Sequence, residues 1–233
     1  MKNPTIPNVR AFTLIELLVI IAIIAILAAV AVPSFSSMFR TSAQAQSASN
    51  LRQWGSGVTL YAGDHSGKLP PVSVATGYLG WDAVVAPYLG LSADPKAVPE
   101  KLFIHPNTPA PKDKQGRARR TYAMARGNDS VGRINTPTVA LATIPEPSKT
   151  ILLSERLHNT SVAQSASAAD LDVRKVGEQQ ARQYNGEAFD LNAGGKFNYL
   201  FVDGHVELLR PEDTIGSGSL NSAKGMWTIT PGD

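Results

Sequence analysis

The sequence of 233 residues contains no cysteine. This absence excludes a disulfide framework and a metal site built on thiolates. Charge is also scarce over one long stretch, because Glu16 is the only charged residue between Phe12 and Phe39. The formal net charge is +3, and Lys2 and Arg10 supply two of the positive charges. Such a small excess gives no support for a nucleic-acid partner, and we expect none.

Positive charge gathers in the run KDKQGRARR at 112–120. The run lacks interleaved aromatic residues and lies among proline and glycine residues. These features are typical of a solvated loop, since a surface that binds single-stranded nucleic acid usually adds stacking side chains. We therefore predict an exposed loop at 112–120.

A long apolar segment runs from Phe12 to Phe35, after a short basic leader at residues 1–11. An ordinary secretory signal has an apolar region of about 7–15 residues, with its cleavage site on the far side. Here the uninterrupted run has about 20 residues, enough to span the roughly 30 Å of hydrocarbon in a bilayer. We therefore predict a hydrophobic transmembrane helix at 12–35. The basic leader places residues 1–11 in the cytoplasm.

The start of this segment, AFTLIE at 11–16 followed by LLVIIAIIAILAAVAVPSF, resembles the type IV prepilin signal. The resemblance implies that prepilin peptidase cleaves between Ala11 and Phe12, and that the new amino group of Phe12 is methylated. Family members usually carry glycine at the position of Ala11, and alanine is small enough for cleavage to be expected. A plain signal anchor is the alternative for this segment, although it leaves the match to FTLIE unexplained.

Glu16 is the unusual residue of the segment, because transfer of a lone carboxylate into hydrocarbon is energetically unfavourable. The resemblance implies that Glu16 of one subunit pairs with the Phe12 amine of a neighbour during filament assembly. Opposite charges attract strongly where the dielectric constant is low, which agrees with that role. The alternative is that Glu16 lies at headgroup depth, one turn into the helix, and is solvated.

The helical pattern continues from the apolar segment through an amphipathic stretch at 36–62, and ends near Gly63–Gly67. Pro33 is expected to kink the helix, because proline removes a backbone hydrogen bond and clashes with the preceding turn. Apolar residues recur at spacings of three and four in the second half, and these spacings predict one buried stripe. The stripe consists of Leu51, Trp54, Val58 and Tyr61.

The remainder, residues 63–233, has the pattern of short strands separated by proline, glycine and asparagine. The predicted strands are 101–105, 120–125, 138–144, 150–155, 197–202, 205–210 and 226–230. Residues 156–196 are weakly patterned and are predicted to form a long surface excursion. The predicted fold class is α+β, with a long N-terminal helix packed on a small antiparallel β-sheet, as in pilins.

A hairpin is predicted at Asp203-Gly204, which lies between two alternating runs. This dipeptide is a strong signature of a two-residue type I′ turn, in which both central residues take positive φ. In that register Phe201 opposes Val206, and Tyr199 opposes Leu208.

Several segments from residue 50 onward are similar to a large group of pseudopilin-like proteins. They are NLRQWGSGVTLYAGDHSGKLPP at 50–71, KLFIHPNTP at 101–109, TYAM at 121–124, PSKTILLSE at 147–155 and FNYLFVDGHVELL at 197–209. This group ends in a processing-associated domain defined by a histidine, nine residues and then Asp-Gly. The chain departs from the group at Ala193, which replaces that histidine. Ser47 and His105 stand where many members of this group carry cysteines. The resemblance therefore suggests that those members have a disulfide at these positions and that this protein lacks it.

Metal-capable residues alternate at the hairpin, where Asp203 is followed by His205 and Glu207. The period of a strand places His205 and Glu207 on one face. A metal centre would need a further ligand and a concave site, which the sequence does not supply. The alternative is that Asp203 is a turn residue and that His205 and Glu207 are polar residues on the exposed face of the sheet. The resemblance to pseudopilins implies calcium as a candidate cofactor, with Asp203 as its first candidate ligand. Otherwise no cofactor and no enzymatic activity are expected.

The resemblance implies a pseudopilin-like subunit that prepilin peptidase processes and that joins other pilin subunits through its N-terminal helix. The system would be a type II secretion or type IV pilus-like machine. The subunit would be a single-pass protein of the inner membrane, in contact with its lipid, with residues 63–233 in the periplasm. The alternative is a membrane-anchored periplasmic binding module that is not a filament subunit. An anchored metallohydrolase is a third reading.

Overall fold

The computed structural model describes residues 12–74, 79–92, 100–108, 119–132, 138–156, 170–172, 174, 176, 180, 183–184, 187–188 and 194–233. Its residues form two compact units, Met1–Phe39 and Arg40–Asp233. Each unit is a body of its own, and helix α1, Leu14–Asp64, contributes to both.

In the first unit, α1 is apolar all round. Its large hydrophobic side chains from Leu14 to Leu27 are 43–82% exposed. Among the residues described, no helix is both long enough and apolar enough to cross a membrane. The transmembrane segment predicted over 12–35 includes residues 30–35, whose side chains lie outside the description. The helical assignment continues through Pro33, and the predicted kink there stays a prediction.

In the second unit, the buried stripe predicted along α1 is confirmed. Leu51, Trp54 and Val58 are at most 1% exposed, and Tyr61 is partly buried against the same core. Gly57 lies on this face, where a Cβ atom would meet Val85 Cγ1 at 2.7 Å. The glycine therefore allows a closer approach of α1 to the neighbouring short helix than any side chain would permit.

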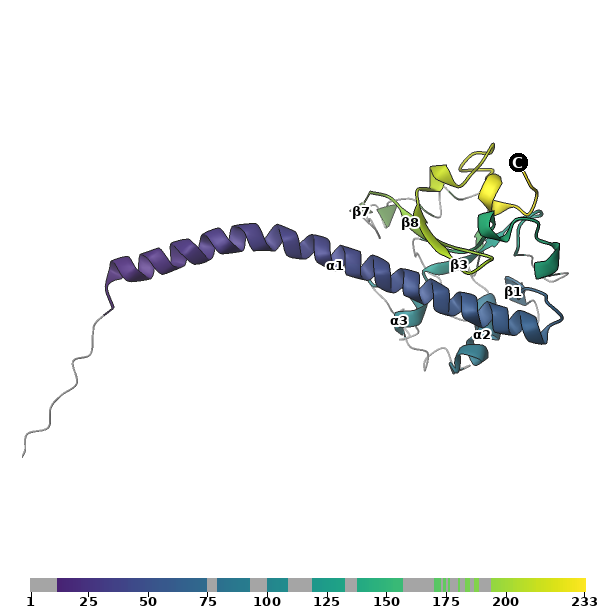
Figure 1. Ribbon diagram of the computed structural model, residues 1–233, viewed down its shortest axis with the longest axis horizontal. Helices are drawn as coiled ribbons and strands as arrows, with labels where there is room; N and C mark the ends of the chain where they lie inside the picture. The colour runs from purple at the N-terminus through teal and green to yellow at the C-terminus, as the bar shows by residue number, and fades with distance from the viewer. Residues whose placement is uncertain are drawn as a thin grey trace, which may run out of the picture. The chain divides into compact units, whose positions relative to one another are not determined.

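The main sheet contains five strands in the order β5-β3-β4-β8-β9, and α1 lies across it (Figure 1). Four strands are antiparallel neighbours, while β5 pairs with β3 in parallel. The bounds are β3 Tyr122–Arg126, β4 Ile151–Glu155, β5 Asp170–Asp172, β8 Phe197–Phe201 and β9 Val206–Leu209. The predicted α+β fold, a long helix on a small antiparallel sheet, is confirmed.

Short elements surround this sheet. Two further strand pairs are β1 Ser73–Val74 with β2 Leu79–Gly80, and β6 Gln183–Tyr184 with β7 Glu187–Ala188. The short helices are α2 Trp81–Val85, α3 Glu100–Phe103, η1 Ala86–Leu89, η2 Leu141–Thr143, η3 Pro147–Lys149, η4 Pro211–Asp213 and η5 Gly225–Trp227. The excursion predicted at 156–196 falls mostly outside the described residues, and β5, β6 and β7 lie within it.

Three predicted strands are wrong. The segment 101–105 overlaps α3, 138–144 contains η2, and 226–230 begins in η5. Each is a short apolar run, and periodicity over so few residues does not separate a strand from a buried helical turn. Their apolar residues are nevertheless core residues, as Phe103 and Trp227 show at 1% and 0% exposure.

One end of the basic run is buried, which corrects the prediction of an exposed loop at 112–120. Arg120 is 1% exposed and forms a bidentate ion pair with Asp82 of α2, which is equally buried. Arg120 Nε donates to Asp82 Oδ2 at 2.9 Å, and Nη2 donates to Oδ1 at 2.5 Å. Residues 112–118 lie outside the described residues.

The β8–β9 hairpin turns over three residues rather than two. The Gly204 N–H donates to Phe201 O at 3.0 Å, and the Phe201 N–H donates to His205 O at 2.9 Å. Gly204 has φ 94°, whereas Asp203 is not among the described residues with positive φ. This is a type I turn followed by a left-handed glycine, which needs one positive φ where a type I′ turn needs two.

The strand register differs from the predicted one as a result. Leu200 pairs with Val206 and Tyr199 pairs with Glu207. The predicted pairing of Tyr199 with Leu208 is therefore wrong by one residue. A slip of one residue moves each partner to the other face of its strand, since side chains alternate along it.

We expect Gly204→Val to lower the free energy of unfolding by about 1–2 kcal/mol, because a β-branched residue is strained at positive φ. No atom lies within 4 Å of the position that a Cβ would take, so the backbone conformation is the only cost. Urea unfolding of the full chain in detergent measures the change. Gly204→Asn, which tolerates this conformation, should lose less. Equal stability of the valine variant and the parent chain would show that this turn is misassigned.

Candidate functional site

The N-terminus of α1 is a reciprocal hydrogen-bonded cap between Thr13 and Glu16. The helix begins at Leu14, so Thr13 is its N-cap residue. The backbone N–H and the hydroxyl of Thr13 donate to Glu16 Oε2 at 2.9 and 2.8 Å. In return the Glu16 N–H donates to Thr13 Oγ1 at 3.3 Å. This arrangement is a capping box, in which two otherwise unpaired backbone donors are satisfied.

This capping role of Glu16 is absent from the sequence prediction, although a signal for it exists. A Ser/Thr-x-x-Glu pattern before an apolar run marks a helix start, and Thr13-Leu14-Ile15-Glu16 has that pattern. The carboxylate is therefore bound to its own helix terminus, and its pairing with the Phe12 amine of a neighbour stays a prediction. Phe12 is 69% exposed, and Ala11 lies outside the described residues.

Residues 6–32 match the family model of the prokaryotic N-terminal methylation motif. The chain carries a type IV prepilin-like N-terminus. This motif indicates a pilin-like or pseudopilin-like precursor that prepilin peptidase processes, and the match does not extend over residues 33–233. No curated protein and no solved structure matched the chain.

At the hairpin, the structure brings together two of the three metal candidates. His205 Nδ1 lies 2.6 Å from Asp203 Oδ1, and the imidazole stacks on Phe201 with ring centroids 4.3 Å apart. Burial acts to raise the pKa of Asp203, but the hydrogen bonds from the His205 side chain and backbone outweigh it and hold the pKa below its ordinary value. Glu207 is exposed on β9. Within the described part of the chain, no three His, Asp or Glu side chains are grouped to hold a metal ion.

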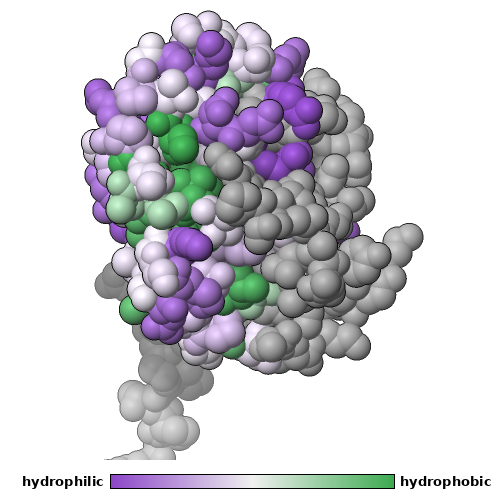
Figure 2. All heavy atoms as spheres, turned by 90° about the vertical axis from the view of Figure 1, so that its right-hand side faces the viewer, coloured by the Kyte–Doolittle hydropathy of each residue, from purple (hydrophilic) through white to green (hydrophobic). Residues whose placement is uncertain are grey.

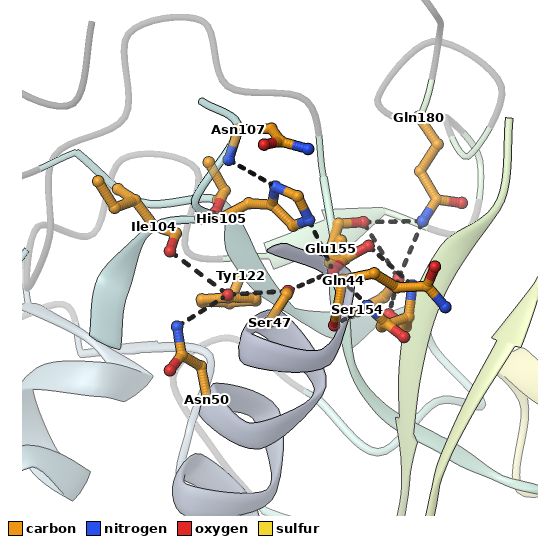
Figure 3. Close-up of polar contacts among 12 residues, drawn as sticks. Gln44, Ser47, Asn50, Ile104, His105, Asn107, Tyr122, Ser154, Glu155 and Gln180 are labelled. Carbon is orange, nitrogen blue, oxygen red and sulfur yellow. Dashed lines mark hydrogen bonds and ion pairs between the residues drawn. The ribbon is translucent and has the colours of Figure 1, made fainter. Parts of the chain in front are cut away.

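A buried polar network lies between α1 and the sheet, with the Glu155 carboxylate of β4 at its centre (Figure 3). Ser47 Oγ donates to Glu155 Oε1, and the Asn198 side chain donates to the same oxygen at 2.8 Å. The Asn198 N–H donates to Oε2 at 2.7 Å. Ser47, Glu155 and His105 are all 0% exposed. A buried carboxylate needs this many donors, because it has lost its hydration.

The other members of the network extend it on both sides. The Asn107 N–H donates to His105 Nδ1 at 3.1 Å, so the proton of the neutral imidazole is on Nε2, which lies 3.6 Å from Glu155 Oε1. The hydroxyl of Tyr122 lies 2.9 Å from Ser47 Oγ. Burial raises the pKa of Tyr122 far above its ordinary value, and the Glu155 carboxylate adds to that effect. Tyr122 therefore stays a neutral partner at physiological pH.

This network contains a serine, a histidine and a glutamate without forming a nucleophilic triad. In a triad the histidine lies between the nucleophile and the acid. Here the carboxylate lies between Ser47 and His105, and all three side chains are closed to solvent. Ser47 and His105, the two positions that the sequence resemblance compares with cysteines, thus both contact the same carboxylate oxygen, Glu155 Oε1. No sequence signal singled out Glu155, because its partners lie far away along the chain.

A cleft of about 480 Å³ lies among η3, η4 and the C-terminal segment. It is lined by Glu146, Lys149, Asp213, Met226, Ile229 and Asp233, among others. Its polar groups already have partners: Lys149 Nζ contacts Glu146 at 2.7 Å, and Asp233 accepts hydrogen bonds from Gly225 and Thr228. The cleft can admit a small polar group, and the sequence prediction contained no counterpart to it.

The described residues of the second unit expose few large hydrophobic side chains. On the face in Figure 2, hydrophilic side chains border small hydrophobic patches. Leu60, 54% exposed, is the one large hydrophobic residue described as exposed between Arg40 and Asp233. Exposed apolar surface is therefore concentrated on α1 of the first unit.

Proposed function

We propose that the chain is a pseudopilin-like subunit held in the inner membrane by its N-terminal helix, with residues 63–233 in the periplasm. Through that helix it joins a filament of a type II secretion or type IV pilus-like system. The observation that supports this most directly is the start of α1, where a capped carboxylate heads an apolar helix within a methylation motif. No catalytic activity, cofactor or nucleic-acid partner is part of the proposal.

The exposed apolar side chains of the helix need an apolar environment that shields them from water. Side chains such as Leu14 and Ile15, at 82% and 69% exposure, would be unfavourable in water, and lipid or neighbouring helices can remove them from it. A helix that is apolar on every side is suited to both environments. The membrane thus holds the subunit before assembly, and neighbouring helices cover the same surface in the filament.

The capping box lowers the energetic cost of the Glu16 carboxylate in the unassembled subunit. Its carboxylate accepts two hydrogen bonds at the positive end of the helix dipole, so it is already stabilised within one subunit. Cleavage after Ala11 creates a positive amine on Phe12, which opposes the same dipole and gains from an anionic partner. During assembly the carboxylate can pair with the Phe12 amine of a neighbour.

Glu16→Gln and Glu16→Leu separate the charge from the cap. Glutamine can still accept the Thr13 hydrogen bonds but carries no charge, whereas leucine loses both functions. We expect both variants to insert and to lose residues 1–11, yet to lose most subunit–subunit crosslinking through the helix. Crosslinking in membranes measures assembly, and intact mass measures cleavage together with addition of one methyl group.

Glu207→Gln is the matched control, since it removes one exposed carboxylate from β9 and should assemble normally. If glutamine assembles and leucine does not, the cap rather than the charge pair is what assembly requires. Normal crosslinking by both variants would contradict the filament role and favour the anchored binding module. A chain that keeps residues 1–11 would contradict the processing itself.

A further inference from the structure

The attachment of α1 to the second unit changes character at Leu51. Toward the C-terminus the buried face is apolar, with Leu51, Trp54 and Val58 in the core. Toward the N-terminus, apart from Ala43, the buried residues are Ser47 and Asn50, at 0% and 1% exposure. The two halves of the contact, 41–50 and 51–62, therefore rest on different interactions.

The polar half is held by hydrogen bonds to several separate elements. Ser47 contacts Glu155 of β4 and Tyr122 of β3. Asn50 Nδ2 donates to Lys101 O on α3 and to Tyr122 Oη, the latter at 3.2 Å. On β8, Asn198 Nδ2 donates to Gln44 O at 3.4 Å. Residues 41–50 are thus tied to the sheet mainly by polar groups that water can satisfy equally well.

The charged and titratable groups around Glu155 come from every element packed on it. They are His105 in the turn after α3, Tyr122 on β3 and Tyr199 on β8, with Arg156 next to Glu155 in the chain, while α1 contributes the neutral Ser47. Glu155 is the group that accepts from both α1 and β8. Its carboxylate therefore joins the polar half of the helix to the sheet.

Opening the two halves has different consequences. Release of 41–50 exposes a carboxylate, hydroxyls and amides, whose hydrogen bonds are replaced by water, so the net change is small. Release of 51–62 exposes Trp54 and its apolar neighbours, for which water offers no compensation. Parts of a protein can open locally at a free energy lower than that of global unfolding. The more weakly attached half, 41–50, is therefore expected to open first.

We propose that residues 41–50 are a releasable strap, which leaves the sheet while 51–62 stays packed, and that Glu155 holds the strap closed. The strap adjoins Arg40, where the second unit begins. Its release lengthens the part of α1 that is free of the domain by up to ten residues, about 15 Å of helix. This inference does not depend on the proposed filament role.

The lack of native cysteines allows a direct test on the full chain in detergent. Ala43→Cys and Ala62→Cys place one thiol in each half, at positions that are 7% and 1% exposed. We expect the thiol at position 43 to be labelled by a maleimide at least tenfold faster than the thiol at position 62. Labelling at 43 should depend little on urea, and labelling at 62 should rise steeply with it, because only the second requires global unfolding.

Glu155→Gln added to each variant should speed labelling at position 43 about tenfold and leave position 62 unchanged. Glu207→Gln is the matched control and should change neither rate. If Glu155→Gln fails to fold by circular dichroism, Ser47→Ala replaces it, with the same direction expected. Equal rates at the two positions, rising together in these variants, would overturn the strap and show that α1 leaves the sheet only when the domain unfolds.

Discussion

Trp54→Ala is expected to lower the free energy of unfolding of the domain by about 3–5 kcal/mol, the range for deleting a buried aromatic side chain. Trp54 is 1% exposed, and its ring meets those of Trp81 and Phe103 edge to face with centroids 5.0 Å away in each case. Its Nε1 also donates to Leu102 O at 2.9 Å. The substitution leaves a cavity and removes that hydrogen bond together.

Thermal unfolding of the full chain in detergent measures the effect, and a fall of the midpoint on the order of 10 °C is expected for a domain of this size. Trp54→Phe keeps part of the ring contact and should lose less. Leu60→Ala, an exposed position on the same helix, should change the free energy by at most about 0.5 kcal/mol. Similar midpoints for Trp54→Ala and Leu60→Ala would contradict the packing of α1 against this core.

Breaking the ion pair between Asp82 and Arg120 should have an effect of the same size. Arg120→Met leaves the Asp82 carboxylate buried without its bidentate donor, and such losses cost about 3–5 kcal/mol. Asp82→Leu leaves the guanidinium buried in the same way. Both side chains are only 1% exposed, so water cannot easily compensate either charge.

The double variant Asp82→Leu with Arg120→Met is expected to be more stable than either single variant, because it removes both buried charges together. Urea unfolding of the parent chain, the two single variants and the double variant gives the coupling energy as a double-mutant cycle. Lys149→Met, which breaks an exposed pair with Glu146, is the matched control and should have little effect. Additive losses in the double variant would contradict a coupled buried pair.

The elements that the sequence predicts correctly are those with strong local patterns. The stripe at Leu51, Trp54 and Val58 was found from its spacing, since one turn of helix separates its members. The strand at 122–126 overlaps the run predicted at 120–125, and the strand at 151–155 lies within the run predicted at 150–155. The methylation motif was recognised because its residues are contiguous.

Some of the predictions that fail depend on partners far apart in the chain. Others depend on a choice between two turn types or between a strand and a helical turn. The burial of Arg120 depends on Asp82, which is 38 residues away. The hairpin register depends on which turn closes it, and one left-handed Gly204 is easier to accommodate than two residues of positive φ. The runs at 101–105 and 226–230 are apolar enough for the core, but too short for their period to distinguish strand from helix.

The sequence by itself determined the apolar N-terminal segment with its single carboxylate, the amphipathic continuation of the helix and the α+β class, because each of these follows from neighbouring residues. Only the tertiary structure placed Glu155 between Ser47 and His105, since Ser47 and Glu155 are 108 residues apart in the chain. It also decided which polar residues of α1 are buried and satisfied. A buried carboxylate is stable only where its donors converge, and that convergence arises when the helix and the sheet pack together.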